Sequence, residues 1–268
     1  MATSNKGTAV VTGASSGIGA IYADRLARRG YDLILVARSE SKLAEVSARL
    51  AGATGRAVEV VAADLNDRSD LRRIETLLRT NAGVTMLVNN AGVGALQPLL
   101  ESDVDDTDAM IQLNVTALTR LTYAAAPAFV ARGGGTIINI ASAVAIAPDL
   151  LNGVYGATKA FVLALSVSLQ KELEGKNVRI QAVLPGATAT KFWDAAGGSL
   201  DQLPSEMVMR SDDLVDAALV GFDRGELVTI PSLPDVGLWD AYEAARQKLI
   251  PSLSLSAPPE RYRIRAAA

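Results

Sequence analysis

Short apolar runs alternate with longer amphipathic stretches along most of the chain. The apolar runs have the length of buried strands, and the stretches between them are long enough for helices. Strands are expected over residues 8–12, 32–37, 57–64, 85–92, 135–142, 178–186 and 226–231. Helices are expected over residues 17–30, 41–51, 67–81, 106–131 and 155–172. This alternation predicts an α/β fold, a single doubly wound Rossmann-type domain in which helices flank both faces of a parallel sheet of about seven strands.

The pattern becomes less regular after the last of these βαβ units. No linker rich in Pro, Gly or Ser precedes residue 185, so we expect one domain over residues 1–268. Residues 187–212 contain "AAGGS" and predict a lid or insertion at the active site. Residues 231–268 form a C-terminal extension, in which 235–250 predicts an extra helix at an interface or over the pocket. The final residues have no core pattern.

Two of the predicted helices carry apolar or small residues on nearly every face. Between residues 113 and 130 the only charged residue is Arg120, and residues 156–172 are similarly apolar. A helix that is apolar all round is buried all round, and the sheet covers only one side of it. We therefore expect a homotetramer or homodimer that is built on the helices around residues 106–131 and 155–172.

The composition narrows the possible chemistry. The chain has a formal net charge of −3 and contains neither His nor Cys. It therefore has no disulfides or thiolate ligands, and no metal site is expected. The charge balance gives no footprint for nucleic acid, and no apolar run approaches the roughly 18 residues of a membrane span. Since the start of the chain has no signal-like segment either, a cytoplasmic protein is expected.

A glycine-rich turn follows the first predicted strand and opens the first helix. In "VVTGASSGIGA" the glycines have the spacing G-x-x-x-G-x-G, a variant of the dinucleotide fingerprint. Glycines let the backbone approach a pyrophosphate, which then lies at the helix N-terminus. The alternative is an ordinary tight turn. The predicted cofactor contacts here are Gly13, Ser15, Ser16, Gly17, Ile18 and Gly19.

The residue after the second strand indicates which dinucleotide binds. Asp32 begins that strand, whereas ligands lie at the carboxyl ends of strands, where Arg38 stands. A guanidinium there suits a 2′-phosphate, so NADP(H) is predicted over NAD(H). The alternative is a solvated surface arginine. Asp64, at the end of the third strand, and Leu65, directly after it, are further expected cofactor contacts, and Asp64 could accept from the adenine amino group.

The fourth strand ends in "NNAG". Its side-chain amides could hold loops in place, and its glycine lets backbone approach a ligand. Asn90, Ala91 and Gly92 are therefore expected to contact the cofactor.

A chain without His must use another proton donor. Tyr155 and Lys159 are four residues apart on a predicted helix and so are neighbours on its surface. A nearby ammonium and an oxidised nicotinamide would both lower the pKa of the phenol towards the working pH, where it can exchange protons. Ser142 would hydrogen-bond the reacting oxygen, and Asn114 could hold a water in a proton relay. Alone, a Tyr-x-x-x-Lys pair on a helix is more often an ordinary solvated pair.

Taken together, "TGASSGIG", "NNAG", "NIAS", "YGATK" and "PGATAT" resemble the short-chain dehydrogenase/reductase family from Thr8 to about Thr190. The resemblance implies that Tyr155 is the general acid/base, that Lys159 tunes it and holds the nicotinamide ribose, and that Ser142 and Asn114 complete the set. It also implies nicotinamide contacts at Pro185, Gly186 and Thr188. Ala141 and Thr158 stand where the family often has Ser, and neither is expected to touch the chemistry.

The expected function is NADP(H)-dependent interconversion of a carbonyl and a secondary alcohol on a small hydrophobic ketone or alcohol. An apolar pocket is suggested by side chains of the lid segment and of neighbouring loops, namely Leu96, Val144, Ile146, Phe192, Trp193, Leu200, Met207 and Met209. Several of these could instead be lid core or oligomer contacts. Two alternatives stay open, a 3-oxoacyl thioester reductase and a non-catalytic NADP-sensing regulator.

Overall fold

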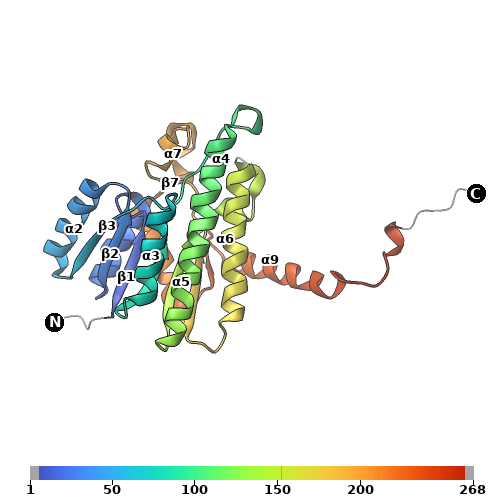
Figure 1. Cartoon of the computed structure of the whole chain (residues 1–268). Helices are drawn as coiled ribbons and strands as arrows, with labels where there is room; N and C mark the ends of the chain where they lie inside the picture. The colour runs from blue at the N-terminus through green and yellow to red at the C-terminus, as the bar shows by residue number, and fades with distance from the viewer. Residues whose placement is uncertain (1–5, 152, 263–268) are drawn as a thin grey trace, which may run out of the picture. The chain divides into compact units, whose positions relative to one another are not determined.

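The computed structural model describes residues 6–151 and 153–262, and seven strands of this part form one parallel sheet in the order β3-β2-β1-β4-β5-β6-β9 (Figure 1). The order reverses next to β1, because β2 and β3 lie on one side of it and β4 on the other. In such sheets ligands bind at the carboxyl edge beside the reversal. The strands are β1 (Thr8–Thr12), β2 (Asp32–Ala37), β3 (Val58–Ala62), β4 (Val84–Asn89), β5 (Gly135–Ile140), β6 (Val178–Val183) and β9 (Val228–Thr229).

Helices cover both faces of this sheet, as the sequence predicts. On one face α1 (Gly17–Arg28), α2 (Glu40–Thr54) and α8 (Ser211–Arg224) pack on strand residues such as Val11. On the other, α3 (Arg68–Thr80), α5 (Leu118–Ala131) and α6 (Gly153–Glu172) pack on residues such as Val10 (Figure 1). Val10 and Val11 serve opposite faces because successive side chains of a strand alternate.

The remaining elements lie outside the main sheet. Helix α4 (Val104–Ile111) continues through a π-helical turn (Gln112–Ala117) into α5. The predicted lid segment contains α7 (Phe192–Ala195) and a two-stranded sheet of β7 (Thr188–Ala189) and β8 (Met209–Arg210).

The chain divides after Ser232 into a large compact unit and a small one that starts at Leu233. The small unit contains α9 (Val236–Leu249), so the helix expected over residues 235–250 is present. The expectation of a single domain over the whole chain stays a prediction.

A buried polar network holds the middle of the sheet to two helices. Asn89 and Asn139 are register partners in β4 and β5, and the Asn89 amide donates to the Asn139 side-chain oxygen at 2.9 Å. The same amide donates to the hydroxyl of Thr122 in α5 at 3.0 Å, and Asn139 donates to Ser166 in α6 at 2.9 Å. Because each amide meets specific partners in the core, this network sets the strand register and the positions of α5 and α6.

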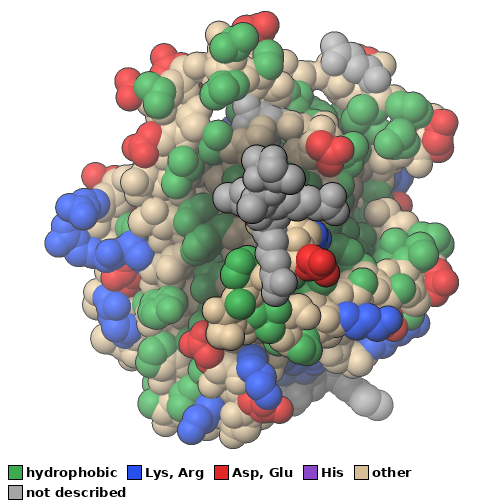
Figure 2. All heavy atoms as spheres, turned by 90° about the vertical axis from the view of Figure 1, so that its right-hand side faces the viewer, with side chains coloured by type: hydrophobic (Ala, Val, Ile, Leu, Met, Phe, Trp, Pro, Cys, Tyr) green, Lys and Arg blue, Asp and Glu red, His purple; other side chains and the backbone are tan. Residues whose placement is uncertain are grey.

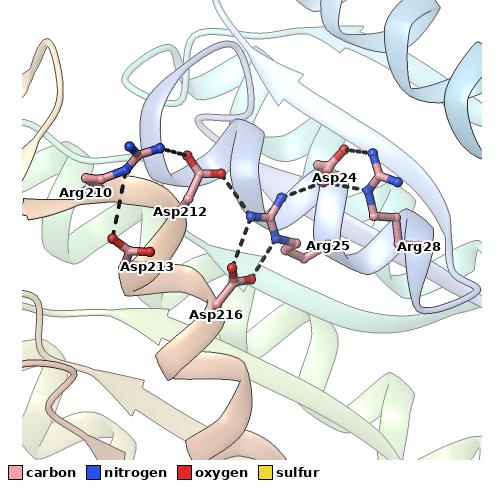
Figure 3. Close-up of polar contacts among 7 residues, drawn as sticks. All are labelled: Asp24, Arg25, Arg28, Arg210, Asp212, Asp213 and Asp216. Carbon is pink, nitrogen blue, oxygen red and sulfur yellow. Dashed lines mark hydrogen bonds and ion pairs between the residues drawn. The ribbon is translucent and has the colours of Figure 1, made fainter.

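Arg25 is the centre of an ion-pair network that connects α1 to α8 (Figure 3). Its guanidinium nitrogens lie 2.7 Å from carboxylate oxygens of Asp24 and Asp216 and 2.9 Å from one of Asp212. Asp212 is the last residue of the predicted lid segment. The network therefore holds the end of that segment against the helix that follows the glycine turn.

Asp24 is expected to make stability depend on pH. Its side chain is buried and accepts from Arg28 at 2.9 Å and Arg25 at 2.7 Å. Burial opposes ionisation, but the hydrogen bonds from Arg28 and Arg25 outweigh it and hold the pKa below its ordinary 3.8. Such a carboxyl stabilises the fold above pH 3.8, and this contribution is lost as pH falls through the lower folded-state pKa.

We expect Asp24→Asn to lower the free energy of unfolding by about 1–3 kcal/mol at neutral pH. The variant should also lose less stability than the parent on acidification below about pH 4, in urea unfolding at several pH values. Asp223→Asn is the control, because Asp223 pairs with Arg29 but its side chain is 56% exposed. That change should cost less than about 0.5 kcal/mol. Equal losses in the two variants would contradict the prediction.

Candidate active site

The glycine turn lies between β1 and α1, at the carboxyl edge of the sheet. Gly13 and Gly17 have φ of +66° and +54°, a region that residues with a Cβ rarely occupy. A Cβ on Gly19 would collide with the Gly13 carbonyl, so α1 begins in close contact with the turn. The Ser16 side chain makes no capping hydrogen bond to α1. The first N–H groups of the helix, at Gly17, Ile18 and Gly19, are therefore available to an anion, with Ser15 beside them.

The "NNAG" segment is hydrogen-bonded to the end of β1. The Asn90 side-chain amide donates to the carbonyls of Thr12 at 2.9 Å and Gly13 at 3.3 Å. In return the Thr12 hydroxyl accepts from the backbone N–H groups of Asn90 and Ala91, both at 3.0 Å. These bonds hold the carboxyl ends of β1 and β4 together. The prediction that an amide of this segment holds loops in place is confirmed for Asn90.

The residues after β2 and β3 lie at the same edge. Arg38 follows β2 directly, is exposed, and forms no ion pair with the described part of the chain. Asp64 is half-buried, and its carboxylate accepts from the backbone N–H of Asn66 at 2.9 Å. The Leu65 side chain is packed in the core beneath α3. Arg38 and Asp64 thus present charged groups at this edge, whereas Leu65 has only its backbone to offer a ligand.

Ser142, Tyr155 and Lys159 come together where β5 ends and α6 begins. The Ser142 hydroxyl hydrogen-bonds the Tyr155 phenol, and it also donates to the Pro185 carbonyl at 3.3 Å. The Lys159 ammonium donates to the Ile140 carbonyl at 3.0 Å and lies 5.8 Å from the centre of the Tyr155 ring. All three side chains are buried. The sequence prediction that they are neighbours agrees with this geometry.

Burial shifts both titrating groups of this cluster away from their charged forms. Burial raises the pKa of Tyr155 to about 12, although the Ser142 hydrogen bond lowers it in part. Burial lowers the pKa of Lys159 to about 8. The expectation of a lowered phenol pKa is therefore wrong for the chain by itself, because desolvation outweighs the favourable contacts.

Asn114 lies in the π-helical turn between α4 and α5 and is 1% exposed. Its side-chain amide donates to the Val93 carbonyl at 2.8 Å, and its oxygen accepts from the Val93 N–H at 3.0 Å. The amide also donates to the Thr158 hydroxyl, which donates to the Tyr155 carbonyl at 2.8 Å. Thr158 was expected not to touch the chemistry, but it connects Asn114 to the backbone of Tyr155.

Gly92 lies where two of these groups meet. A Cβ at this position would be 3.0 Å from the Asn114 side-chain oxygen and 3.4 Å from the Lys159 ammonium. A larger residue would therefore press on both side chains.

The segment after β6 completes the edge. The Pro185 carbonyl accepts from the Ala143 N–H at 2.8 Å, which places it beside Ser142. The Thr188 hydroxyl donates to the Gly186 carbonyl at 3.0 Å, and the Thr188 carbonyl accepts from the Trp193 indole at 2.9 Å. The residues expected at the nicotinamide are thus hydrogen-bonded to the Ser142 loop on one side and to the lid segment on the other.

The lid segment places an aromatic ring on Tyr155. The Phe192 ring lies 5.6 Å from the Tyr155 ring, centre to centre, and 5.9 Å from that of Trp193. A Cβ on Gly94 would overlap the Phe192 ring, so a glycine there makes room for it. Val144 packs with Tyr155 in the same small apolar cluster. Phe192 and Val144 therefore form the apolar wall around the phenol.

An apolar cavity of about 750 Å³ begins beside this wall. It is lined by Leu96, Pro98, Leu99, Ser102, Val104, Thr107, Leu150, Leu151, Gly153 and Val154. Of the other side chains expected at the pocket, Met207 is 61% exposed and Met209 packs on the core beneath α1 and α8. Those two methionines lie away from the cavity because the lid segment turns back into β8, towards α8.

Residues 7–198 match the sequence profile of the family described as short chain dehydrogenase. The chain belongs to this family.

Among curated relatives, the duck (Anas platyrhynchos) very-long-chain 3-oxoacyl-CoA reductase is 36% identical to this chain over 208 residues. That match covers 76% of this chain but only 66% of the duck protein, so the chain spans just under two thirds of its length.

Two solved structures cover nearly the whole chain. A short-chain dehydrogenase from Sphingobium yanoikuyae in complex with NADPH is 49% identical, with a TM-score of 0.93, and the match covers 96% of this chain and 100% of that one. A bulky-bulky ketone specific alcohol dehydrogenase from Comamonas testosteroni is 44% identical, with a TM-score of 0.89, over 97% of this chain and 99% of that one.

Several contributors to this dehydrogenase site could not be found from sequence motifs. Gly94 acts through the space that it leaves, and Leu99 and Leu150 reach the cavity from short 3-10 helices. Thr12 and Thr158 did give a signal, as parts of "TGASSGIG" and "YGATK". Among the described residues, no group of three or more acidic or metal-binding side chains could hold a metal ion. No described helix is both long and apolar enough to span a bilayer.

Lys159 is expected to cost the dehydrogenase stability at neutral pH. Since its folded pKa of about 8 lies below the ordinary 10.5, the unfolded chain binds more protons between these values. Stability should therefore rise as pH increases from about 8 towards 10. This pKa shift corresponds to a loss of about 3 kcal/mol in the free energy of unfolding while the lysine is charged. A Lys159→Met variant would avoid that loss, but it would also lose the hydrogen bond to Ile140, which contributes about 1 kcal/mol.

Lys159→Met should thus unfold at higher urea concentration at pH 7, by about 2 kcal/mol, and the gain should shrink as the pH approaches 10. Lys171→Met is the matched control, because the Lys171 side chain is 81% exposed. That variant should change by less than about 0.5 kcal/mol. If Lys159→Met were less stable than the parent at pH 7, burial of the Lys159 ammonium would not cost the stability that we expect.

Proposed function

We propose that this chain is an NADP(H)-dependent oxidoreductase that interconverts a carbonyl and a secondary alcohol on a bulky hydrophobic substrate. The observation that carries the proposal is the cluster of Ser142, Tyr155 and Lys159 beside the glycine turn. It supplies a phenolic proton donor and a cation at the sheet edge where a dinucleotide would lie.

The residues at this edge fit NADP(H). The positive-φ glycines leave room for a pyrophosphate, and the first N–H groups of α1 can donate to it. The exposed Arg38 guanidinium suits a 2′-phosphate, and Asp64 lies at the end of the neighbouring strand. The Sphingobium relative, whose structure is described as a complex with NADPH, supports this choice of cofactor. Pro185, Gly186 and Thr188 would hold the nicotinamide end.

The side chains of the cluster have separate tasks. When bound, the reduced nicotinamide supplies the hydride for the substrate carbonyl carbon. Tyr155 donates its proton to the carbonyl oxygen, so that an alkoxide does not accumulate. Ser142, already hydrogen-bonded to the phenol, holds the same oxygen. Lys159 places a positive charge near the phenol and so favours the phenolate that remains. Asn114 positions the backbone on which Tyr155 stands, through Thr158.

The cavity indicates the substrate class. Most of its lining is aliphatic, and none of the described residues that line it is Lys or Arg. A volume of about 750 Å³ suits a ketone with two large substituents better than a small one. The Comamonas relative is named for specificity towards bulky-bulky ketones, which supports this proposal.

A second candidate is reduction of 3-oxoacyl thioesters. The curated 3-oxoacyl-CoA reductases favour it, although the match spans only 66% of the duck protein. Against it, a coenzyme A phosphate would find no cationic side chain among the described residues of the cavity lining. Turnover of acetoacetyl thioesters at rates equal to those of bulky ketones would favour the second candidate.

We also propose a homo-oligomer built on α5 and α6, as the sequence led us to expect. Tyr123 in α5 is 61% exposed and Phe161 in α6 is 40% exposed, and Ala157 and Ala164 lie exposed on the same side of α6 as Phe161. Figure 2 shows hydrophobic side chains spread over the face that is drawn, among charged and other side chains. A second copy would remove these side chains from water. The cytoplasmic location stays a prediction.

Removing the phenolic hydroxyl tests the mechanism. Tyr155→Phe should lower kcat for NADPH-dependent ketone reduction by about 100-fold or more, because general acid catalysis typically contributes that much. NADPH affinity, followed by nicotinamide fluorescence, should change little. Tyr31→Phe serves as control, since Tyr31 precedes β2 at the opposite edge of the sheet, and it should retain full turnover. Near-normal turnover in a folded Tyr155→Phe protein would refute the proposed acid.

Replacing Arg38 tests the cofactor. Arg38→Asp should weaken NADPH binding by about 10- to 100-fold, since a hydrogen bond to a charged group contributes about 1.5–3 kcal/mol. NADH binding should stay the same or tighten, because an acid can accept from the 2′-hydroxyl. Arg49→Asp, on the exposed side of α2, controls for net charge. Equal NADH and NADPH affinity in the parent would make Arg38 a bystander. Binding of neither nucleotide would revive the non-catalytic interpretation of the fold.

A further inference from the structure

Helix α9 (Val236–Leu249) has no buried residue, although a third of it is large and apolar. Asp235 caps its start by accepting from the Gly237 N–H at 2.8 Å. Val236, Leu238, Tyr242 and Leu249 are between 47% and 60% exposed. An isolated helix of this length is marginal in water, so the helix gains stability only if another surface covers its apolar side.

The apolar side chains of α9 form one stripe. Leu238, Tyr242, Ala245 and Leu249 recur at intervals of four, three and four residues, which places them on the same face. We call these four residues the α9 stripe. Trp239 flanks it and stacks on Tyr242 with ring centres 5.3 Å apart. Beyond the helix, Ile250, Leu253 and Leu255 extend the exposed apolar surface.

The charges on α9 argue for a protein partner and against a lipid surface. Acidic residues occupy the first half of the segment (Asp235, Asp240, Glu243) and basic residues the second half (Arg246, Lys248). A helix that lies on a membrane usually has a polar face rich in Lys and Arg. Here the acidic groups are as numerous as the basic ones within the helix, so anionic lipids have no net attraction for it.

We propose that α9 pairs antiparallel with α9 of a second copy of this chain, across a two-fold axis near the middle of the stripe. In that arrangement Leu238 lies level with Leu249 of the partner, and Tyr242 lies level with the small Ala245 of the partner. The acidic half of each helix faces the basic half of the other. A parallel pair would instead bring like charges to the same level, which is unfavourable.

The available area is of the right order for such an interface. Six large apolar side chains from Leu238 to Leu255 are each about half to three-quarters exposed. At on the order of 100 Å² each, they offer about 600 Å² per chain, compared with the roughly 800 Å² per partner of a standard interface. The match to the Sphingobium structure covers 96% of this chain, which leaves fewer residues unmatched than the second unit contains. At least part of the second unit therefore has a counterpart in that relative.

The absence of Cys from the sequence makes a direct test possible. Ala245→Cys puts a single thiol on the stripe close to the proposed axis, and Ala244→Cys puts one on the opposite side of the same helix. Both alanines are exposed, so neither change should disturb folding. After mild oxidation of the full-length protein, Ala245→Cys should run as a covalent dimer on a non-reducing gel. Ala244→Cys should give at least tenfold less dimer.

A second pair of variants tests the stripe without a cross-link. Leu238→Lys/Leu249→Lys should raise the dissociation constant of the dimer that involves α9 at least tenfold in sedimentation velocity. Val236→Lys, on the opposite side of α9, should leave it unchanged although Val236 is 60% exposed. Oxidation that cross-links both cysteine variants equally would overturn the proposal. So would assembly unaffected by the double lysine variant, or a monomeric parent that binds phosphatidylcholine or phosphatidylserine vesicles.

Discussion

The hydrogen bonds between the ends of β1 and β4 are the constraint on which the rest of this site depends. Asn90 donates to the carbonyls of Thr12, the last residue of β1, and of Gly13, and the Thr12 hydroxyl accepts from the first N–H groups after β4. A parallel sheet ends all its strands at one edge, but it does not by itself determine where the loops beyond that edge go. These bonds hold two such loops together where the strand order reverses. The glycine turn and the Asn114 contact to Val93 are built on either side of them.

The absence of His and Cys determines how this site handles protons. A phenol and an amine have ordinary pKa values well above neutral, and burial moves them in opposite directions, to about 12 for Tyr155 and about 8 for Lys159. Burial therefore disfavours the charged form of each group in the free chain. The surrounding fold must supply the stability that this arrangement removes. The buried amide network through Asn89 and Asn139 lies directly beneath the site and holds α5 and α6 to the sheet.

Exposed apolar surface is common to the remaining features of the molecule. The cavity beside Tyr155, the exposed residues of α5 and α6, and the α9 stripe all expose hydrophobic side chains to water. These surfaces differ in shape, and we infer different functions for them from their shapes. A concave apolar site suits a small molecule, whereas convex helical faces suit another helix. If the two proposed faces, on α5/α6 and on α9, each pair with themselves, they would meet the requirement of a closed tetramer with two-fold axes.

The sequence by itself determined the sheet of seven strands, its helices and the edge at which the site lies. Short apolar runs and amphipathic stretches report burial directly, and strand–turn–helix order restricts the topology of a parallel sheet. It also singled out Ser142, Tyr155, Lys159 and Arg38, because their chemistry is unusual where they stand.

Only the tertiary structure decided the direction of the Tyr155 pKa, the link that Thr158 makes to Asn114, and which apolar residues reach the cavity. Each of these depends on side chains that are distant along the chain, and so on burial and distances that no local pattern encodes. Met207 and Phe192 belong to the same irregular segment, yet Phe192 packs on Tyr155 while Met207 is exposed to solvent. Both residues are hydrophobic, so residue type does not distinguish them. The path of the backbone between β7 and β8 determines which of the two is buried against Tyr155.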